Sequence, residues 1–460
     1  MVNWKPSLAA TEAHVRSITE IIKHFKQNWT EELSGDSIAK ACRDAGMTWL
    51  DSMLNPVVTV QIFMIQILHG NTACQHMPHL CEMAFTAAGY CKARMRIKLE
   101  VFEFLLSRCV GSIQQQTLDA GRWLGHRVFM VDGSSFSMPD TIALQNHFGQ
   151  HTSQKPGCGF PTAHWLGMLH MGTGMITKML ASPLRTHDMA RTAELHPELK
   201  AGDLLVADRA FCSFAHLCLL IERRAEAVLR VHQKTIVDFT PQRPYTNPNR
   251  TNPIKGLPRS RWLRQLGVTD QVVVWLKNRT NGPAWMTKEQ YALLPDEITV
   301  RELRYSINQK GFRTKKITLV TTLLDHEVYS LEELADLFRR RWEIETHFGQ
   351  IKTTMAMDVL KCQTVDGVLK ELHMFALIYN LVRQVIVIAA ANQNIAMSRI
   401  SFIDALRWLR SVKVGNELTK LVVNPHRPNR YEPRVKKRRP KTYNLMTKPR
   451  NQLKKDFAIQ

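Results

Sequence analysis

The sequence has 460 residues, a length that accommodates roughly two to four domains with a substantial core. Its 44% hydrophobic and 22% charged residues are typical of a soluble globular protein. The 62 Lys and Arg residues outnumber the 40 Asp and Glu residues, which gives a net charge of +22. This excess indicates a polyanionic partner, with nucleic acid as the first candidate and an anionic membrane as the alternative.

Residue order argues against secretion and against a membrane span. Residues 1–15 contain no apolar run of the kind that a secretory signal needs. The longest apolar run, residues 374–391, contains Asn380, Arg383 and Gln384, which favours a buried helix. The nine cysteines form no regular framework and predict reduced thiols in a cytosolic protein.

A cluster of sulfur and imidazole side chains lies at Cys74, His76, His79 and Cys81. These residue types ligate zinc, but their spacing matches no standard zinc motif. We therefore favour chance proximity over a metal site.

Residues 7–110 have the apolar periodicity of helices, most clearly in residues 8–25, 38–54 and 57–68. Residues 36–47 begin with a capping residue and end at a glycine, as one helix of a helix-turn-helix pair does. An ordinary helical bundle is the alternative for this segment. A basic patch at Lys92, Arg94, Arg96 and Lys98 precedes the next region.

The middle of the chain predicts an α/β domain, because strand-like and helix-like runs alternate. Predicted strands cover residues 128–131, 164–180 (two strands around a glycine turn), 203–207 and 225–231, and a helix covers residues 213–223. Residues 232–315 are rich in proline and then contain strand-like runs at 271–276 and 298–307, which predicts a β-rich insertion. A further strand-like run covers residues 316–324, and helical periodicity then covers residues 330–391 and 402–409.

The stretch 331–352 is predicted to be one helix. Ser330 and Glu333 form a capping-box pattern, and no Pro or Gly interrupts the stretch before Gly349. At 100° per residue, Phe338, Arg341, Glu345 and Lys352 fall on one narrow face. A carboxylate flanked by cations suits a site that holds a metal and a phosphate chain. A solvated ion-pair face is the alternative.

Two further carboxylates follow apolar strands. Asp132 follows residues 128–131 and precedes Gly133, and Asp208 follows residues 204–207. Carboxylates at strand ends of an α/β domain face the edge where ligands bind. Together with Glu345 they form a donor set that can hold two Mg²⁺ ions for phosphoryl transfer. A plain turn at Asp132 and a capping role for Asp208 are the alternatives.

At these motifs the sequence resembles the bacterial DDE transposases of insertion sequence family four. The family signature is Tyr, two residues, Arg, three residues, Glu, six residues, Lys, and Phe338, Arg341, Glu345 and Lys352 reproduce its spacing. The strand ending in Asp-Gly-Ser matches at Asp132, and the strand followed by Asp-Arg-Ala-Phe matches at Asp208. The β-rich insertion between Asp208 and Glu345 also follows the family arrangement. The departure is Phe338, which lacks the hydroxyl of the family's Tyr.

The resemblance implies a ribonuclease-H-like core that cleaves and joins DNA with two Mg²⁺ ions, for which Mn²⁺ substitutes. It implies that Asp132, Asp208 and Glu345 are catalytic metal ligands. It further implies cut-and-paste transposition, with a DNA hairpin at the transposon end, by a homodimer on paired terminal inverted repeats and target DNA. An aromatic side chain from the insertion would then hold a flipped base; core packing is the alternative for each Trp. The implied DNA-binding residues are Phe338, Arg341, Lys352, Arg209, Trp275, Trp285, Lys436, Lys437, Arg438 and Arg439.

We expect five segments on this basis: a helical DNA-binding domain at 1–120, the catalytic core at 121–231 and 316–395, the insertion at 232–315, and a helical region with a basic tail at 396–460. The expected location is the bacterial cytoplasm, on the nucleoid. A structure-specific nuclease of the same fold and a non-catalytic DNA-binding repressor remain alternatives. Strand joining separates the first from a transposase, and the three intact carboxylates argue against the second.

Overall fold

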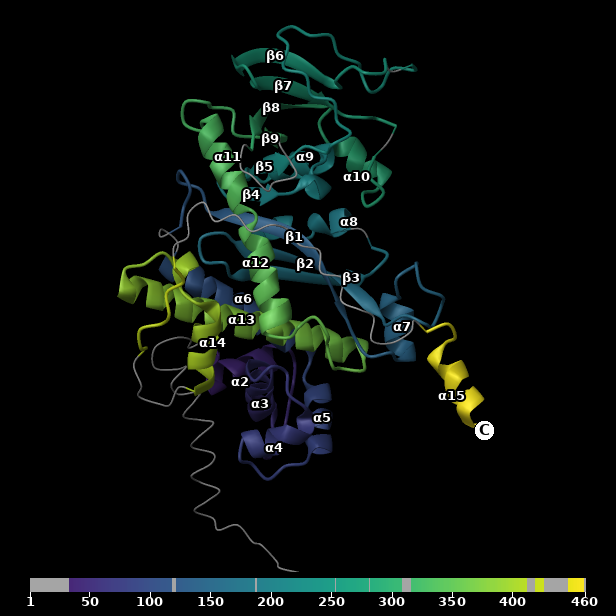
Figure 1. The fold of residues 1–460 in the computed structure, drawn as a ribbon, viewed down its shortest axis with the longest axis vertical. Helices are drawn as coiled ribbons and strands as arrows, with labels where there is room; N and C mark the ends of the chain where they lie inside the picture. The colour runs from purple at the N-terminus through teal and green to yellow at the C-terminus, as the bar shows by residue number, and fades with distance from the viewer. Residues whose placement is uncertain are drawn as a thin grey trace, which may run out of the picture.

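The computed structural model describes residues 33–117, 121–186, 188–252, 254–280, 282–307, 316–411, 418–425 and 446–458. The molecule is elongated, with the helices nearest the N-terminus at one end and strands β6 and β7 at the other (Figure 1). The strands are β1 (Val128–Ser137), β2 (Thr162–His170), β3 (Ile176–Pro183), β4 (Leu204–Ala207), β5 (Glu226–Arg230), β6 (Ser260–Gly267), β7 (Asp270–Leu276), β8 (Glu297–Ser306) and β9 (Lys316–Thr321).

Helices flank these strands on both sides and form the N-terminal part (Figure 1). The first helices are α2 (Gly35–Asp44), α3 (Pro56–Leu68), η2 (Cys74–His76), α4 (Met77–Leu80), α5 (Ala87–Arg96) and α6 (Leu99–Thr117). Those among the strands are α7 (Ile142–Phe148), α8 (Asp188–Thr192), η3 (His196–Glu198), η4 (Arg209–Phe211), α9 (Phe214–Glu222) and α10 (Lys288–Leu293). The remainder are α11 (Leu331–Arg340), α12 (Glu343–Gly349), η5 (Gln350–Thr354), α13 (Val365–Gln393), η6 (Met397–Arg399), α14 (Phe402–Ser411) and α15 (Arg450–Ala458).

All nine strands belong to one mixed sheet in the order β3-β2-β1-β4-β5-β9-β8-β7-β6. Strands β1, β4 and β5 are parallel, whereas β2 and β3 pair antiparallel beside β1. On the other side, β9 pairs antiparallel with β5 and begins an antiparallel ladder that ends at β6. The strands of the segment 232–315 therefore continue the sheet that carries β1 and β4.

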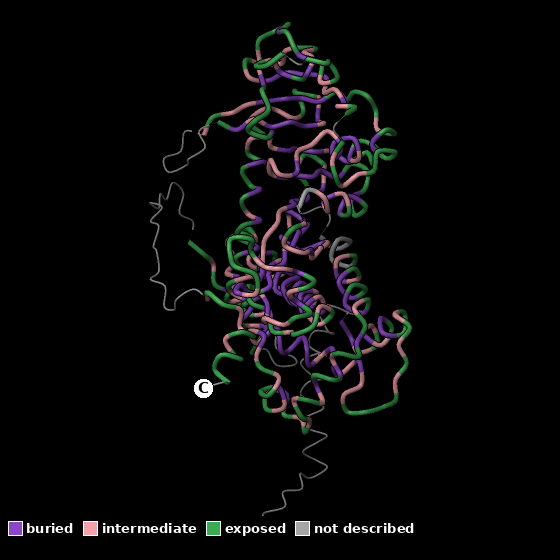
Figure 2. Tube along the Cα trace, turned by 90° about the vertical axis from the view of Figure 1, so that its right-hand side faces the viewer, coloured by how far each residue is buried: buried purple, intermediate pink, exposed green. Residues whose placement is uncertain are grey.

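The sheet separates two hydrophobic cores, because successive side chains of a strand point to opposite faces. In β1, Val128 and Met130 join the core that contains α6 and α13, whereas Phe129 and Val131 join the core that contains α9. Figure 2 shows the resulting band of buried chain through the middle of the molecule. This arrangement is a mixed α/β fold with helices on both faces of a large sheet.

Helix α13 lies at the centre of the larger core and contacts α3, α6, α14 and β3. It is long and apolar enough to cross a membrane, and 83% of its most apolar window is buried inside the protein. A helix that is apolar on all sides and buried in this way is a core element. The interpretation of residues 374–391 as a buried helix is thus confirmed.

Most elements predicted in the middle of the chain are present. The glycine hairpin of residues 164–180 is formed by β2 and β3, and the predicted helix 213–223 corresponds to α9. The prediction missed β6, in which Arg261 and Arg264 interrupt the apolar pattern. It also extended the helix in residues 38–54 too far, because α2 ends at Asp44.

The predicted helix-turn-helix is not formed by α2 and α3. Residues 45–55 separate the two helices, whereas that motif uses a turn of about 3–4 residues. The predicted helix at residues 8–25 lies outside the described residues.

Helix α15 extends from the body next to α7 (Figure 1). Its first residue makes the attachment: Arg450 Nη1 lies 2.5 Å from Asp140 Oδ2, and the guanidinium lies 4.2 Å from the centroid of the Phe160 ring. No residue of α15 is buried among those the structure describes. The helix is therefore held at its N-terminal end.

Candidate active site

Asp132 and Asp208 lie side by side at one edge of the sheet. Strands β1 and β4 are parallel, and Val131 is paired with Ala207. Asp132 is the next residue of β1, which continues to Ser137, so the predicted strand end at residue 131 is wrong. Asp208 directly follows the last residue of β4. Residues in register on parallel neighbours point to the same face. The two carboxylates that the sequence singled out thus come together at the edge predicted for a ligand site.

Each of these aspartates faces an arginine. Arg341 Nη1 lies 3.6 Å from Asp132 Oδ2, and Arg230 Nη1 lies 3.5 Å from Asp208 Oδ1. Asp132 Oδ1 also accepts a hydrogen bond of 2.8 Å from the backbone N–H of Gly133, which fixes one side of the carboxylate. The edge therefore combines two partly exposed carboxylates with two guanidinium groups.

Glu345 lies on α12, which packs against β1. The residues that bracket it in the chain both reach β1: Arg341 contacts Asp132, and Lys352 Nζ donates a 3.1 Å hydrogen bond to Ser134 Oγ. Glu345 itself is exposed. The segment that carries the third predicted carboxylate therefore crosses directly over the strand that carries the first.

The predicted single helix over residues 331–352 is wrong in one respect: its winding changes on both sides of Glu345. Ser330 Oγ caps α11 by accepting from Glu333 N–H at 3.1 Å, as predicted. Between Phe338 and Glu345 the backbone then makes tighter bonds to the third residue back, including Arg341 N–H to Phe338 O at 3.1 Å. After Gly349 it widens into the π-helical turn η5. Such local changes of winding are frequent at functional sites, and they shift side chains away from an ideal arc.

Arg341 and Phe338 lie inside the protein rather than on its surface. Phe338 is 1% exposed and belongs to the main hydrophobic core, and Arg341 is 3% exposed. The guanidinium of Arg341 lies 5.6 Å from the Phe338 ring centroid and 5.1 Å from that of Trp342. Its buried Nε has no hydrogen-bond partner among the residues that the structure describes. The aromatic rings thus support a charged group that points to Asp132.

Among the described residues, no three His, Cys, Asp or Glu side chains lie close enough together to hold a metal ion. The donor chemistry nevertheless suits a divalent cation, since Asp132 and Asp208 supply hard carboxylate oxygens directly after the last residue pair of the β1–β4 ladder. Arg341 and Arg230 are the cations next to these oxygens in the structure.

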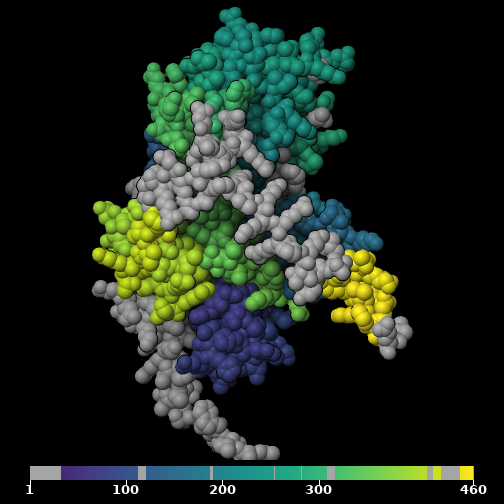
Figure 3. All heavy atoms as spheres, viewed as in Figure 1, coloured from purple at the N-terminus to yellow at the C-terminus, as the bar shows by residue number. Residues whose placement is uncertain are grey.

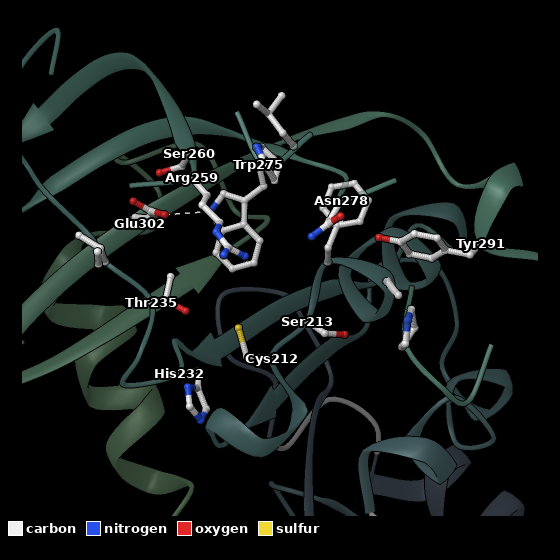
Figure 4. Close-up of a pocket in the computed structure, with 16 residues that line it drawn as sticks. Cys212, Ser213, His232, Thr235, Arg259, Ser260, Trp275, Asn278, Tyr291 and Glu302 are labelled. Atoms are coloured by element: carbon white, nitrogen blue, oxygen red, sulfur yellow. Dashed lines mark hydrogen bonds between the residues drawn. The ribbon is translucent and has the colours of Figure 1, made fainter. Parts of the chain in front are cut away.

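Trp275 lines a cavity of about 420 Å³ on the face of the sheet that packs against α9 (Figure 4). The cavity is lined partly by Cys212 and Ser213, which follow Asp208, and by His232, which follows β5. The Trp275 indole N–H donates a 2.8 Å hydrogen bond to Glu302 Oε1. Glu302 is 1% exposed, and this burial raises the pKa of its carboxyl group. The hydrogen bond to the buried Glu302 carboxyl group therefore fixes the orientation of the Trp275 indole.

Trp285 lies in a different environment. Its ring is stacked on that of His216, with centroids 4.7 Å apart and an angle of 17° between the planes. Its indole N–H is buried without a hydrogen-bond partner. Trp285 also lines a second cavity, of about 720 Å³, next to Cys218 and Leu294. Its ring is packed against a buried residue.

The other predicted DNA-binding residues divide into two groups. Arg209 follows Asp208 directly, and its Nη1 donates a 2.7 Å hydrogen bond to Gln233 Oε1 at the end of the neighbouring strand. The tail residues Lys436, Lys437, Arg438 and Arg439 lie outside the described residues.

Three residues that contact the predicted site residues were not predicted from the sequence. Arg230, Ser134 and Glu302 contact Asp208, Lys352 and Trp275, respectively. Arg230 could have been suspected as the polar end of the apolar run in β5, and Ser134 as part of the Asp-Gly-Ser motif. Glu302 lies within a strand, where nothing in the local pattern distinguishes it.

Residues 123–381 match the family model described as Transposase DDE domain. The chain is 24% identical, over 340 residues that cover 70% of each protein, to Transposase InsG for insertion sequence element IS4 from Escherichia coli (strain K12). Among solved structures it is similar to the piggyBac transposase synaptic complex with hairpin DNA, with a TM-score of 0.42 and 8% identity over 89% of this chain and 82% of that one. This chain is a DNA transposase that belongs to the transposase DDE domain family, among the DDE transposases of insertion sequence family four.

Proposed function

We propose that Asp132, Asp208 and Glu345 form the catalytic centre, on a ribonuclease-H-like core, and that this centre cleaves transposon ends and joins them to target DNA. The observation that carries the proposal is the position of Asp132 and Asp208 directly after the last residue pair of the parallel β1–β4 ladder, with α12 across β1. The strand order β3-β2-β1-β4-β5, with β2 antiparallel, supports the ribonuclease-H-like assignment.

The proposed cofactor is a pair of Mg²⁺ ions, with Mn²⁺ as a substitute. Asp132, Asp208 and Glu345 would hold them, since all three offer carboxylate oxygens. When bound, such ions lower the pKa of an attacking water or 3′-hydroxyl group and stabilise the leaving oxygen at phosphorus. The protein contributes the fixed positions of the two aspartates on neighbouring strands.

The cations next to the carboxylates are proposed to hold the DNA backbone. Arg341 is rigid, because it is buried and supported by two aromatic rings, and its Nη1 faces Asp132. Lys352 is anchored on Ser134, and Arg209 follows Asp208. A guanidinium held at this edge makes charge-assisted hydrogen bonds to a phosphate and positions the scissile bond relative to the carboxylates.

Trp275 is the better candidate for a platform that holds a base out of a hairpin end. It lines an accessible cavity together with Cys212 and Ser213, which follow Asp208 in the chain, and its hydrogen bond to Glu302 fixes the ring before a base arrives. A base stacked on an aromatic ring gains about 1–3 kcal/mol. Trp285, which stacks on His216, is the weaker candidate.

The wider assignments follow the same proposal. Residues 1–120 and the tail that contains Lys436, Lys437, Arg438 and Arg439 would bind DNA outside the catalytic centre, with the core at 121–231 and 316–395 and the insertion at 232–315. Strand transfer from two paired ends would require a homodimer on the terminal inverted repeats.

The test uses the purified full chain and a linear DNA that carries the gene with its native flanks. We expect cleavage and joined products in Mg²⁺, and loss of both in Asp132→Asn, Asp208→Asn and Glu345→Gln. The matched control is Asp336→Asn, which removes an exposed carboxylate of α11. Cleavage by the Asp132→Asn enzyme would overturn the proposed centre. Cut products without joined products would instead identify a nuclease.

A further inference from the structure

A third cavity, distinct from those lined by Trp275 and Trp285, lies on the side of α12 that faces away from Glu345. It has a volume of about 750 Å³ and is lined by residues of α12, α13 and the start of α14. At 100° per residue, Glu343, Thr346, His347 and Gln350 share the face of α12 that lines this cavity, and Glu345 lies on the opposite face. In Figure 3 the lime surface of α14 lies beside the green surface that includes α12. The cavity is thus separate from the carboxylate edge.

The wall of this cavity contains a buried guanidinium. Arg383 of α13 is 5% exposed, and its Nε donates a 2.7 Å hydrogen bond to the backbone oxygen of Thr173. Within the described ranges, its two Nη groups make no hydrogen bond or ion pair with the protein. Burial lowers the pKa of Arg383, since a charge in a low-dielectric environment is costly. Burying a cation without a carboxylate partner is unfavourable, and a bound anion would offset that cost.

The neighbouring groups do not neutralise Arg383. Glu343 lines the same cavity and its negative charge acts on Arg383, but its Oε1 pairs with Arg340 Nε at 3.1 Å, so one carboxylate is shared between two arginines. The pKa of His347 is lowered to about 3, chiefly by burial and further by Arg383, so its ring is neutral at neutral pH. His347 Nδ1 lies 2.9 Å from the Tyr379 hydroxyl group. The cavity therefore retains a positive charge.

The position of Arg383 is fixed by the turn between β2 and β3. Gly174 has φ +69°, and a Cβ atom there would lie 2.9 Å from Arg383 Nε and would overlap the His347 ring. The Tyr379 hydroxyl group donates a 3.0 Å hydrogen bond to the Gly174 oxygen. The turn, α12 and α13 are packed so closely that the guanidinium is preorganised for a ligand.

We propose that this cavity binds a phosphodiester group of DNA, at a site separate from the carboxylate edge. Arg340, at the end of α11, lines the cavity, while the next residue, Arg341, faces Asp132. A DNA strand that follows the junction of α11 and α12 would place phosphates against both arginines. The net charge of +22 favours a polyanion as the occupant. The inference rests on the action of the chain on DNA and not on the identity of the metal ligands.

The test places a negative charge in the cavity without removing Arg383. Ser401 lines the cavity, and its Oγ accepts a 3.3 Å hydrogen bond from the N–H of Asp404 at the start of α14. Asp and Asn both serve well at such a capping position, so Ser401→Asp and Ser401→Asn retain the helix cap and differ by one charge. Arg383→Gln is the third variant. Binding of the full chain to a short mixed-sequence duplex is measured in EDTA at several salt concentrations.

We expect Ser401→Asn to bind as the unchanged protein does. Ser401→Asp and Arg383→Gln should bind more weakly, with a slope of log affinity against log salt that is smaller by about one, the value for one lost phosphate contact. An Asp336→Asn protein, which lacks an exposed carboxylate of α11, should keep the full slope. Because binding is measured in EDTA, this test does not depend on a metal held by the catalytic carboxylates. Equal slopes for Ser401→Asp and Ser401→Asn would overturn the proposal.

A second measurement separates DNA from free phosphate. Inorganic phosphate is added to the full chain, and the thermal midpoint is followed without DNA. If phosphate raises the midpoint of Ser401→Asn more than that of Ser401→Asp while the two bind DNA equally, the cavity takes a free oxyanion, and the assignment to DNA is wrong.

Discussion

Arg341 Nη1 lies 3.6 Å from Asp132 Oδ2, so the C-cap of α11 is joined to the middle of β1 by opposite charges. The arginine is buried and the aspartate is partly exposed. The residue pair that is proposed to act on DNA is therefore also a contact between the helix layer and the sheet.

Replacing Asp132 with Asn should reduce stability, because it leaves the buried guanidinium of Arg341 without its carboxylate. We expect the free energy of unfolding to fall by about 1–3 kcal/mol, a value at the lower end for buried pairs because Asp132 is partly solvated. Urea denaturation measures this change. The control is Asp336→Asn, whose exposed pair with Arg339 should contribute about 0–1 kcal/mol. Equal losses in the two variants would contradict this account.

Phe338→Tyr tests the departure from the family signature. The ring is buried in the core, so an added hydroxyl group needs a partner, and the Arg341 guanidinium, 5.6 Å from the ring centroid, is one candidate. We expect stability within about 1 kcal/mol of the unchanged protein, and equal or higher cleavage of transposon-end DNA. Thermal unfolding and end cleavage are measured together. A large loss of both would mean that the site around residue 338 has no room for the hydroxyl group.

Gly174→Ala should be more damaging than an ordinary glycine replacement in the left-handed region. Gly202→Ala is the matched control, since Gly202 has φ +82° and its Cβ would meet nothing within 4 Å. We expect a cost of about 1 kcal/mol for the backbone strain alone at Gly202. The clash with His347 and Arg383 should add about 1–3 kcal/mol at Gly174. Guanidinium denaturation compares the two, and similar costs would show that the turn relaxes freely.

His196→Phe should make the protein less sensitive to acid. His196 is 2% exposed, and its pKa is lowered from 6.5 to about 3, first by burial and then by His216 and Arg223. Between these values the unfolded chain binds one more proton than the folded one, so stability falls as pH decreases below 6.5 and the loss is complete near pH 3. The difference between the two proteins should grow by about 1.4 kcal/mol per pH unit in that window.

The measurement for His196→Phe is the unfolding free energy as a function of pH. His151→Phe, at an exposed histidine, is the control and should follow the unchanged protein. Parallel curves for the unchanged protein and His196→Phe would show that His196 is not kept neutral by the fold.

Much of the fold was predictable because it follows from local patterns. The hairpin of β2 and β3 is marked by glycines in its turn, and α9 is marked by the capping Ser213. The edge strand β6 was missed because its exposed side alternates with arginine, which resembles a loop. That β9 joins β5 could not be predicted, since strand pairing depends on contacts distant in the sequence.

The candidate site was predictable in its residue types but not in its burial. The apolar runs before Asp132 and Asp208 predicted strands that the structure contains, and the register of β1 and β4 brings the two residues together. The strand end before Asp208 is correct, whereas β1 continues past Asp132 to Ser137 because it pairs there with β2. The sequence placed Arg341 on a helix face suited to a metal and a phosphate chain, with a solvated ion-pair face as the alternative. It did not predict that Arg341 is buried and lies next to Asp132, in a stretch where the helix winding tightens. Helix winding of this kind is set by tertiary contacts, which a sequence periodicity does not contain.

The continuous sheet has a consequence for the DNA. Asp208 and Trp275 belong to strands that are linked by backbone hydrogen bonds through β5, β9 and β8, with no hinge between them. The span from the catalytic edge to the aromatic ring is therefore set by the protein. A duplex end that contacts both Asp208 and Trp275 must bend and unstack to match that span. End sequences that deform easily would require the least free energy for this step.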